Sequence, residues 1–106
     1  MLAFKMPDRP IACTLDPAQL ASRRDTLLPG VIARAESTEF VPNGARWRFR
    51  PSSELMLALA TMIDAERRCC PFLRFQVVAE AGNGPVWLEV TGPVGTREFL
   101  ERLPGL

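Results

Sequence analysis

The feature that most constrains the fold is one long amphipathic helix, predicted to run from Ser52 or Ser53 to about Cys70. Serine is a favoured N-cap residue, and Pro71 cannot continue the hydrogen bonding of a helix. One narrow stripe of this helix is apolar and consists of Leu55, Leu59 and Met62. Because a helix with a single apolar stripe must bury it against another element, the rest of the chain has to supply a covering layer.

Segments on both sides of the helix alternate between apolar and polar residues, a pattern that predicts strands. The predicted strands are residues 11–15, 31–39, 45–50, 73–77 and 86–91. Turns containing Asn and Gly, at 42–44 and 82–84, predict two hairpins. Two further helices are predicted over 16–28 and 96–103, and Pro29-Gly30 is predicted to end the first of them.

This order of elements predicts an α+β fold. Strands joined by hairpins are antiparallel, and the helices between strands cross over the sheet. We therefore expect a two-layer sandwich in which a mostly antiparallel sheet has its helices on one face, and a ferredoxin-like arrangement is the nearest expected relative. A length of 106 residues is enough for one domain, residues 1–106, and too short for two independent cores.

Composition excludes several classes of function. The sequence has no histidine, which excludes imidazole acid–base catalysis, the Ser-His-Asp triad and metal sites that need imidazole. The formal net charge of +1 gives no electrostatic reason to expect nucleic acid or an anionic membrane as a partner. No apolar run is long enough to cross a bilayer or to form a signal peptide, so we expect a cytoplasmic protein.

A carboxylate and two thiols continue the apolar stripe of the long helix. Glu66 lies on the line of the stripe, with Cys69 and Cys70 on either side of it. Core packing alone does not select a carboxylate at such a position. Cys13 belongs to the apolar face of the strand over 11–15, the face that the long helix should cover. These four side chains are therefore predicted to converge at one end of the interface between helix and sheet.

Such a cluster indicates a site for a soft metal or metalloid ion. Three thiolates suit As(III), Hg(II), Cd(II) or Cu(I), for which the softness of sulfur outweighs geometry. Zinc normally takes a fourth ligand, here Glu66, an aspartate or water. The odd count of three cysteines does not suit a secreted disulfide framework, so we expect reduced thiols in a reducing compartment.

Two other interpretations stay open. In the first, the cysteines are small core residues of an interaction or dimerisation module. A solvated or dimer-forming stripe on the open sheet face would then consist of Arg34, Arg46, Arg48 and Arg50. Trp87 and Phe72 would suggest a subunit contact if exposed. In the second, the protein is a thiol-dependent redox protein. A disulfide between adjacent cysteines closes a strained ring, so Cys13 is the better redox partner.

Several segments of the chain also match a known pattern. These are IACTL at 11–15, ERRCCPFLRF at 66–75, PVWL at 85–88 and TGPVGTREFL at 91–100. In these segments the chain resembles a family of small bacterial proteins without an established activity, associated with heavy-metal resistance gene neighbourhoods. The resemblance covers most of the chain and implies a soft-metal role for Cys13, Cys69 and Cys70.

Overall fold

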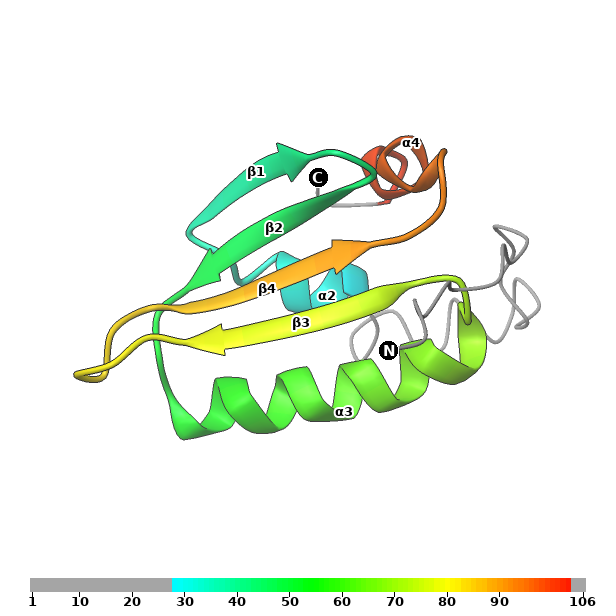
Figure 1. Ribbon diagram of the computed structural model, residues 1–106. Helices are drawn as coiled ribbons and strands as arrows, with labels where there is room; N and C mark the ends of the chain where they lie inside the picture. Colours follow the sequence, from blue (N-terminus) through cyan, green and yellow to red (C-terminus); the bar gives the residue numbers. More distant parts are fainter. Residues whose placement is uncertain (1–27, 104–106) are drawn as a thin grey trace, which may run out of the picture.

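The computed structural model describes residues 28–103 and confirms the α+β class (Figure 1). Its elements are, in chain order, α2 (Leu28–Ile32), β1 (Ser37–Val41), β2 (Gly44–Phe49), α3 (Ser53–Cys69), β3 (Arg74–Ala79), β4 (Val86–Thr91) and α4 (Thr96–Glu101). The strand predicted at 11–15 and most of the helix predicted at 16–28 lie outside the described residues.

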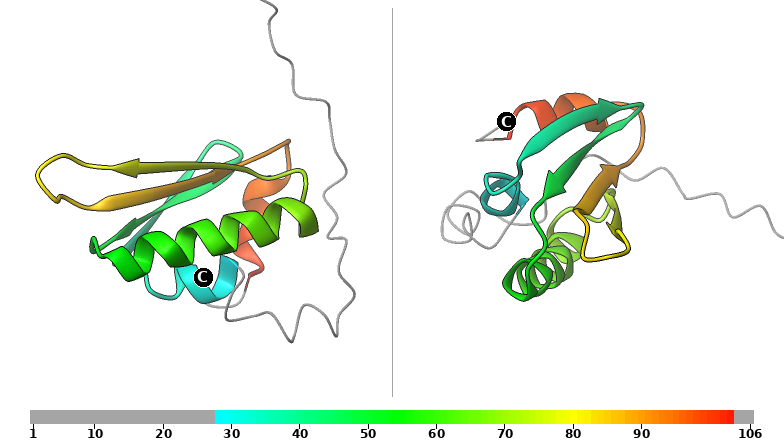
Figure 2. Two further views of the ribbon diagram at one scale, coloured as in Figure 1. Left: turned by 90° about the horizontal axis from the view of Figure 1, so that it is seen from below. Right: turned by 90° about the vertical axis from the view of Figure 1, so that its left-hand side faces the viewer.

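The four strands form one antiparallel sheet in the order β1-β2-β4-β3. β4 lies between β2 and β3, so β2 and β3 run in the same direction and α3 provides the crossover between them. The helices lie on one side of the sheet, with α3 and α2 beneath it (Figure 2). The predicted hairpins are both present, and Asn43 and Asn83 adopt the positive φ of 57° that such turns favour.

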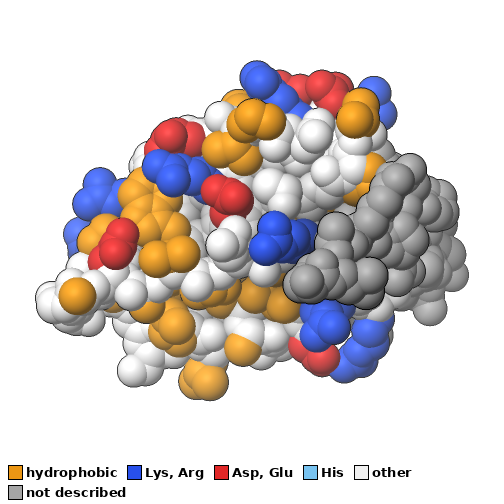
Figure 3. All heavy atoms as spheres, in the orientation of Figure 1, with side chains coloured by type: hydrophobic (Ala, Val, Ile, Leu, Met, Phe, Trp, Pro, Cys, Tyr) orange, Lys and Arg blue, Asp and Glu red, His pale blue; other side chains and the backbone are white. Residues whose placement is uncertain are grey.

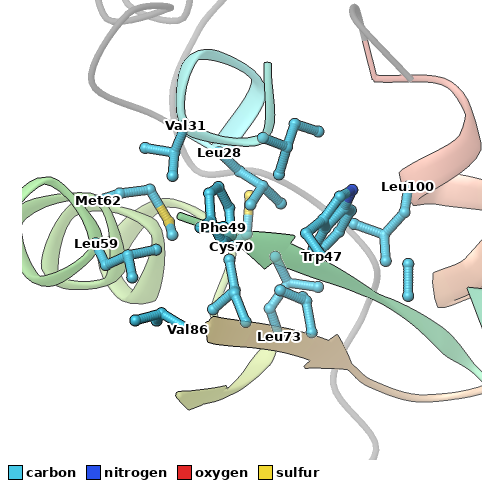
Figure 4. Close-up of a cluster of buried hydrophobic side chains, with 14 of the residues drawn as sticks. Leu28, Val31, Trp47, Phe49, Leu59, Met62, Cys70, Leu73, Val86 and Leu100 are labelled. Carbon is cyan, nitrogen blue, oxygen red and sulfur yellow. The ribbon is translucent and has the colours of Figure 1, made fainter. Parts of the chain in front are cut away.

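The core forms where alternate residues of the central strands meet the stripe of α3. On β2 and β4 the buried side chains are Ala45, Trp47, Phe49, Val86, Leu88 and Val90. Leu59 and Met62 of α3 face Phe49 and Val86 (Figure 4). The stripe predicted from the spacing of Leu55, Leu59 and Met62 is thereby confirmed, because all three are at most 2% exposed.

The segment after residue 28 differs from the prediction. Pro29-Gly30 was expected to end a helix and Val31 to begin a strand, but helix α2 spans both, and β1 begins only at Ser37. Pro29 occupies the first turn of α2, where a backbone N–H has no helical partner, so proline starts this helix rather than ending one. Val31 is buried on the same side as Leu28, and the burial of both side chains in the core stabilises the helical conformation of this segment.

Phe72 and Trp87 were expected to suggest a subunit contact if they were exposed, and neither is fully exposed. Phe72 is fully buried and packs edge-to-face against Phe99, with ring centroids 5.1 Å apart. Trp87 lies half-buried on the open sheet face, with the guanidinium of Arg46 4.5 Å above its ring. The contact suggested for Phe72 is therefore wrong, since Phe72 is a core residue.

Between Leu28 and Leu103 no helix combines the length and the apolar character needed to cross a bilayer.

Candidate metal centre

The last turn of α3 positions the candidate site. Ser52 caps the helix as predicted, because its hydroxyl accepts a hydrogen bond of 3.0 Å from the Leu55 N–H. At the other end Cys70 is the C-cap, and its N–H donates to the Glu66 carbonyl at 2.6 Å. This fixed register turns Glu66 and both cysteines toward the core, where each is at most 4% exposed.

Glu66, Cys69 and Cys70 form a compact cluster. One ligand atom from each residue, a carboxylate oxygen or a Sγ, lies within 4.8 Å of the other two. The Cys70 Sγ donates to the Cys69 Sγ at 3.5 Å. The predicted convergence of these three side chains is observed, whereas Cys13 lies outside the described residues.

Glu66 also has a structural role that the sequence did not reveal. Its Oε2 accepts a hydrogen bond of 2.8 Å from the backbone N–H of Leu28, the first residue of α2. This bond satisfies a buried N–H at a helix start and ties α2 to the end of α3. Pro29 could have indicated that a helix starts here, because proline is tolerated in a first turn. No local pattern, however, connects this helix start to a residue 38 positions away.

Burial disfavours the charged forms of Glu66 and Cys70. Desolvation raises the pKa of Glu66, although hydrogen bonds from Leu28 and the Cys70 thiol work against the rise. Desolvation, the Glu66 charge and the hydrogen bond to Glu66 together raise the pKa of the Cys70 thiol to about 12. At neutral pH the Cys70 sulfur is therefore protonated.

The two adjacent cysteines differ in oxidation state. Cys69 is in a disulfide, whereas Cys70 has a thiol. The expectation of reduced thiols concerns a reducing compartment and stays a prediction, while the Cys69 sulfur is oxidised in this structure. Since only a thiolate binds a soft ion, Cys69 needs reduction before it can serve as a ligand.

The charged neighbours on α3 face solvent, as the helical spacing predicted. Asp64, Arg67 and Arg68 are all exposed, and Arg68 forms an ion pair with Asp64 one turn earlier. Such an exposed pair contributes little to stability. Both arginines come within the last turn, where positive charge is favourable to the end of the helix.

Replacing Glu66 with glutamine tests the effect of the buried charge. The variant Glu66→Gln retains an oxygen that can accept from Leu28. In the wild type the raised pKa means that the protonated carboxyl favours folding; this contribution is complete below the usual value of 4.5 and is lost as pH rises through the folded pKa. We therefore expect the free energy of unfolding of the variant, minus that of the wild type, to increase as pH rises from about 4 to about 8.

Urea unfolding of the two reduced chains across this pH range provides the measurement. Glu98→Gln, at an exposed carboxylate on α4, is the matched control. If the wild type instead became more stable relative to the variant as pH rose, the pKa of Glu66 could not be raised in the folded protein.

Comparisons of the chain with protein-family models, curated proteins and solved structures found no match.

Proposed function

We propose that the reduced protein binds one soft metal or metalloid ion through the thiolates of Cys69, Cys70 and Cys13, with Glu66 beside them as fourth ligand or hydrogen-bond acceptor. The observation that carries this proposal is the buried cluster on α3, in which ligand atoms of Glu66, Cys69 and Cys70 lie within 4.8 Å of one another. Distances of this size suit donor atoms that share one ion.

The donor set favours a soft ion over a hard one. Thiolates select ions such as As(III), Hg(II), Cd(II) and Cu(I), whereas Mg²⁺ and Ca²⁺ take oxygen ligands. One oxygen of Glu66 accepts from Leu28, and Glu66 also accepts from the Cys70 thiol, a bond that is lost when that thiol gives up its proton to bind an ion. Tetrahedral zinc would need a Glu66 oxygen in addition to the three sulfurs.

The inclusion of Cys13 rests on the sequence pattern, which puts Cys13 on the apolar face of the strand predicted over 11–15. Cys69 is in a disulfide, so its sulfur can bind an ion only after reduction. Reduction by a dithiol, which becomes a disulfide itself, restores the Cys69 thiol.

Proton release is expected to accompany binding. The Cys70 thiol, with its pKa raised to about 12, must lose its proton before the sulfur can coordinate an ion. Affinity should therefore fall as pH falls. Arg67 and Arg68 add positive charge to the same helical turn and would offset part of the negative charge of a thiolate cluster.

A thiol-dependent redox protein is the second candidate, favoured by the disulfide of Cys69 and by the Cys70 Sγ 3.5 Å from it. Exchange between a thiol and a disulfide requires a thiolate, and the raised pKa of Cys70 leaves very little of it at neutral pH. This opposes rapid exchange. An interaction module with structural cysteines would account for their burial, while Glu66 would serve only to hold α2.

Titration of the reduced chain with arsenite, Hg(II), Cd(II) and Zn(II), followed by native mass spectrometry, distinguishes these functions. We expect one tightly bound equivalent of a soft ion in the wild type, lost in Cys13→Ser and in the double variant Cys69→Ser/Cys70→Ser. Met62→Leu, which removes a buried sulfur that is not a thiol, is the matched control and should bind as the wild type does. Binding that ignores Cys13 would refute the three-thiolate site, and no tight binding would favour the structural interpretation.

A further inference from the structure

We infer that a second copy of this chain pairs with the outer edge of β3, so that two four-stranded sheets join into one across a two-fold axis at Val77. Within residues 28–103, β3 is hydrogen-bonded to β4 on one side and ends the sheet on the other (Figure 1). An edge strand presents a row of backbone donors and acceptors, and proteins usually protect such an edge. The inference does not depend on metal binding.

The backbone of β3 decides which residues face outward. The N–H of Glu80, just after the strand, donates to the Pro85 carbonyl at 3.1 Å. In an antiparallel pair, hydrogen-bonded and non-hydrogen-bonded residues alternate, so every second residue before Glu80 is bonded to β4. The N–H and C=O groups of the intervening residues, Phe75, Val77 and Ala79, therefore point to the outer edge.

These outward groups restrict how a second β3 can pair. Antiparallel pairing must place outward residues opposite outward residues. With the axis at Val77, Phe75 lies opposite Ala79 of the second copy, and Val77 lies opposite its own counterpart. Each of these pairs can exchange two hydrogen bonds, and the whole strand is used.

The charges at the two ends of β3 favour this register. With the axis at Val77, Arg74 lies opposite Glu80 of the second copy, once at each end. Both side chains are exposed, and they share the open face of the sheet. A shift by two residues would preserve the hydrogen bonding but would place Arg74 opposite Val78 or beyond the strand, and would lose both opposite-charge pairs.

The two edges of the sheet differ in how well they are protected. On β1, Glu39 forms an ion pair with Arg46, and the Arg97 guanidinium lies 4.8 Å from the ring centre of the exposed Phe40. On β3 no charged residue and no proline occurs between Arg74 and Glu80, while Val77 and Val78 are 38% and 45% exposed. Among residues 28–103, the β3 edge thus lacks the usual devices against pairing.

Apolar surface also continues from β3 onto α3. Met56 and Leu57 are 41% and 70% exposed. Hydrophobic side chains gather over β3 and the neighbouring part of α3 in the space-filling view (Figure 3). In a dimer paired at β3, the Val77 side chain of each copy would therefore lie next to apolar surface of the other copy.

Sedimentation equilibrium of the full chain under reducing conditions tests the interface. We expect twice the monomer mass of 11.8 kDa for the wild type. Arg74→Glu and Glu80→Arg should each weaken the dimer about tenfold or more, because each places like charges opposite one another twice. The double variant Arg74→Glu/Glu80→Arg should restore it. Arg102→Glu, at an exposed position after α4, should leave the mass unchanged.

A second variant tests the backbone pairing itself. Val77→Pro removes an outward N–H without removing a hydrogen bond to β4, so it should give a folded monomer by circular dichroism. A wild type that sediments as a monomer would overturn the inference, whether its β3 edge is open or covered by residues 1–27. A dimer indifferent to all the β3 variants would also overturn it, because the interface would then lie elsewhere.

Discussion

Replacing Cys70 with serine is expected to lower the affinity of the reduced protein for Cd(II) or arsenite by more than about 100-fold. Loss of a residue that merely supports a metal ligand costs about 10–100-fold, and Cys70 is proposed to be a ligand itself. A hydroxyl is a hard donor that stays protonated and cannot replace a thiolate. Competition against a chelator of known affinity, at constant pH, gives the ratio of dissociation constants.

The control for this variant must separate ligand loss from loss of packing. Cys70 is 4% exposed, so the serine variant is also expected to be less stable. Leu73→Val removes buried volume at a neighbouring site, 6% exposed, without changing a donor atom. If Leu73→Val weakened ion binding as much as Cys70→Ser does, loss of packing would account for the effect, and the assignment of Cys70 as a ligand would lose its support.

Replacing Phe72 with alanine is expected to reduce the free energy of unfolding by about 3–5 kcal/mol. The ring is fully buried and meets Phe99 edge-to-face at 5.1 Å, so the substitution removes apolar burial and an aromatic contact and leaves a cavity. Denaturant unfolding of both reduced chains measures the difference. Because Phe72 follows the candidate site by two residues, ion affinity should also fall.

Phe40→Ala provides the matched comparison for this loss. Phe40 is 40% exposed on β1, where its ring contacts Arg97 and is not part of the buried core. Its replacement should cost less than half as much as that of Phe72. Equal costs at the two positions would mean that Phe72 is not the core anchor that its burial indicates.

The sequence predicted α3 and its surroundings well because local patterns determine them. Ser52 and Pro71 bracket the helix, and the apolar spacing from Leu55 to Met62 defines its buried side. The alternation of Ala45, Trp47 and Phe49 likewise assigned the buried face of β2 correctly. In these elements local preference and tertiary burial agree, which is the condition under which a sequence is informative.

Other features depended on contacts that a local pattern does not contain. The start of α2 at Leu28 is stabilised by Glu66, 38 residues away, so Pro29-Gly30 read as the end of a helix and not its beginning. The place of β4 between β2 and β3 is a property of the whole sheet. No hairpin rule determines which neighbour a strand takes on its second side.

The candidate site was predictable in part. The spacing of Glu66, Cys69 and Cys70 placed them on one side of α3 because helical geometry is regular. The position of Cys70 at the carboxyl end of a helix indicates a raised thiol pKa, but its main cause, desolvation by burial, depends on tertiary packing, as does the disulfide of Cys69. The juxtaposition with Cys13, which lies outside the described residues, stays a prediction.

X-ray absorption spectroscopy of the reduced protein loaded with one equivalent of arsenite reports the atoms bound to the arsenic. We expect sulfur as the nearest neighbour, with one sulfur from each of the three cysteines. A shell of oxygen atoms, or a sulfur shell that is unchanged in Cys13→Ser, would contradict the three-thiolate site.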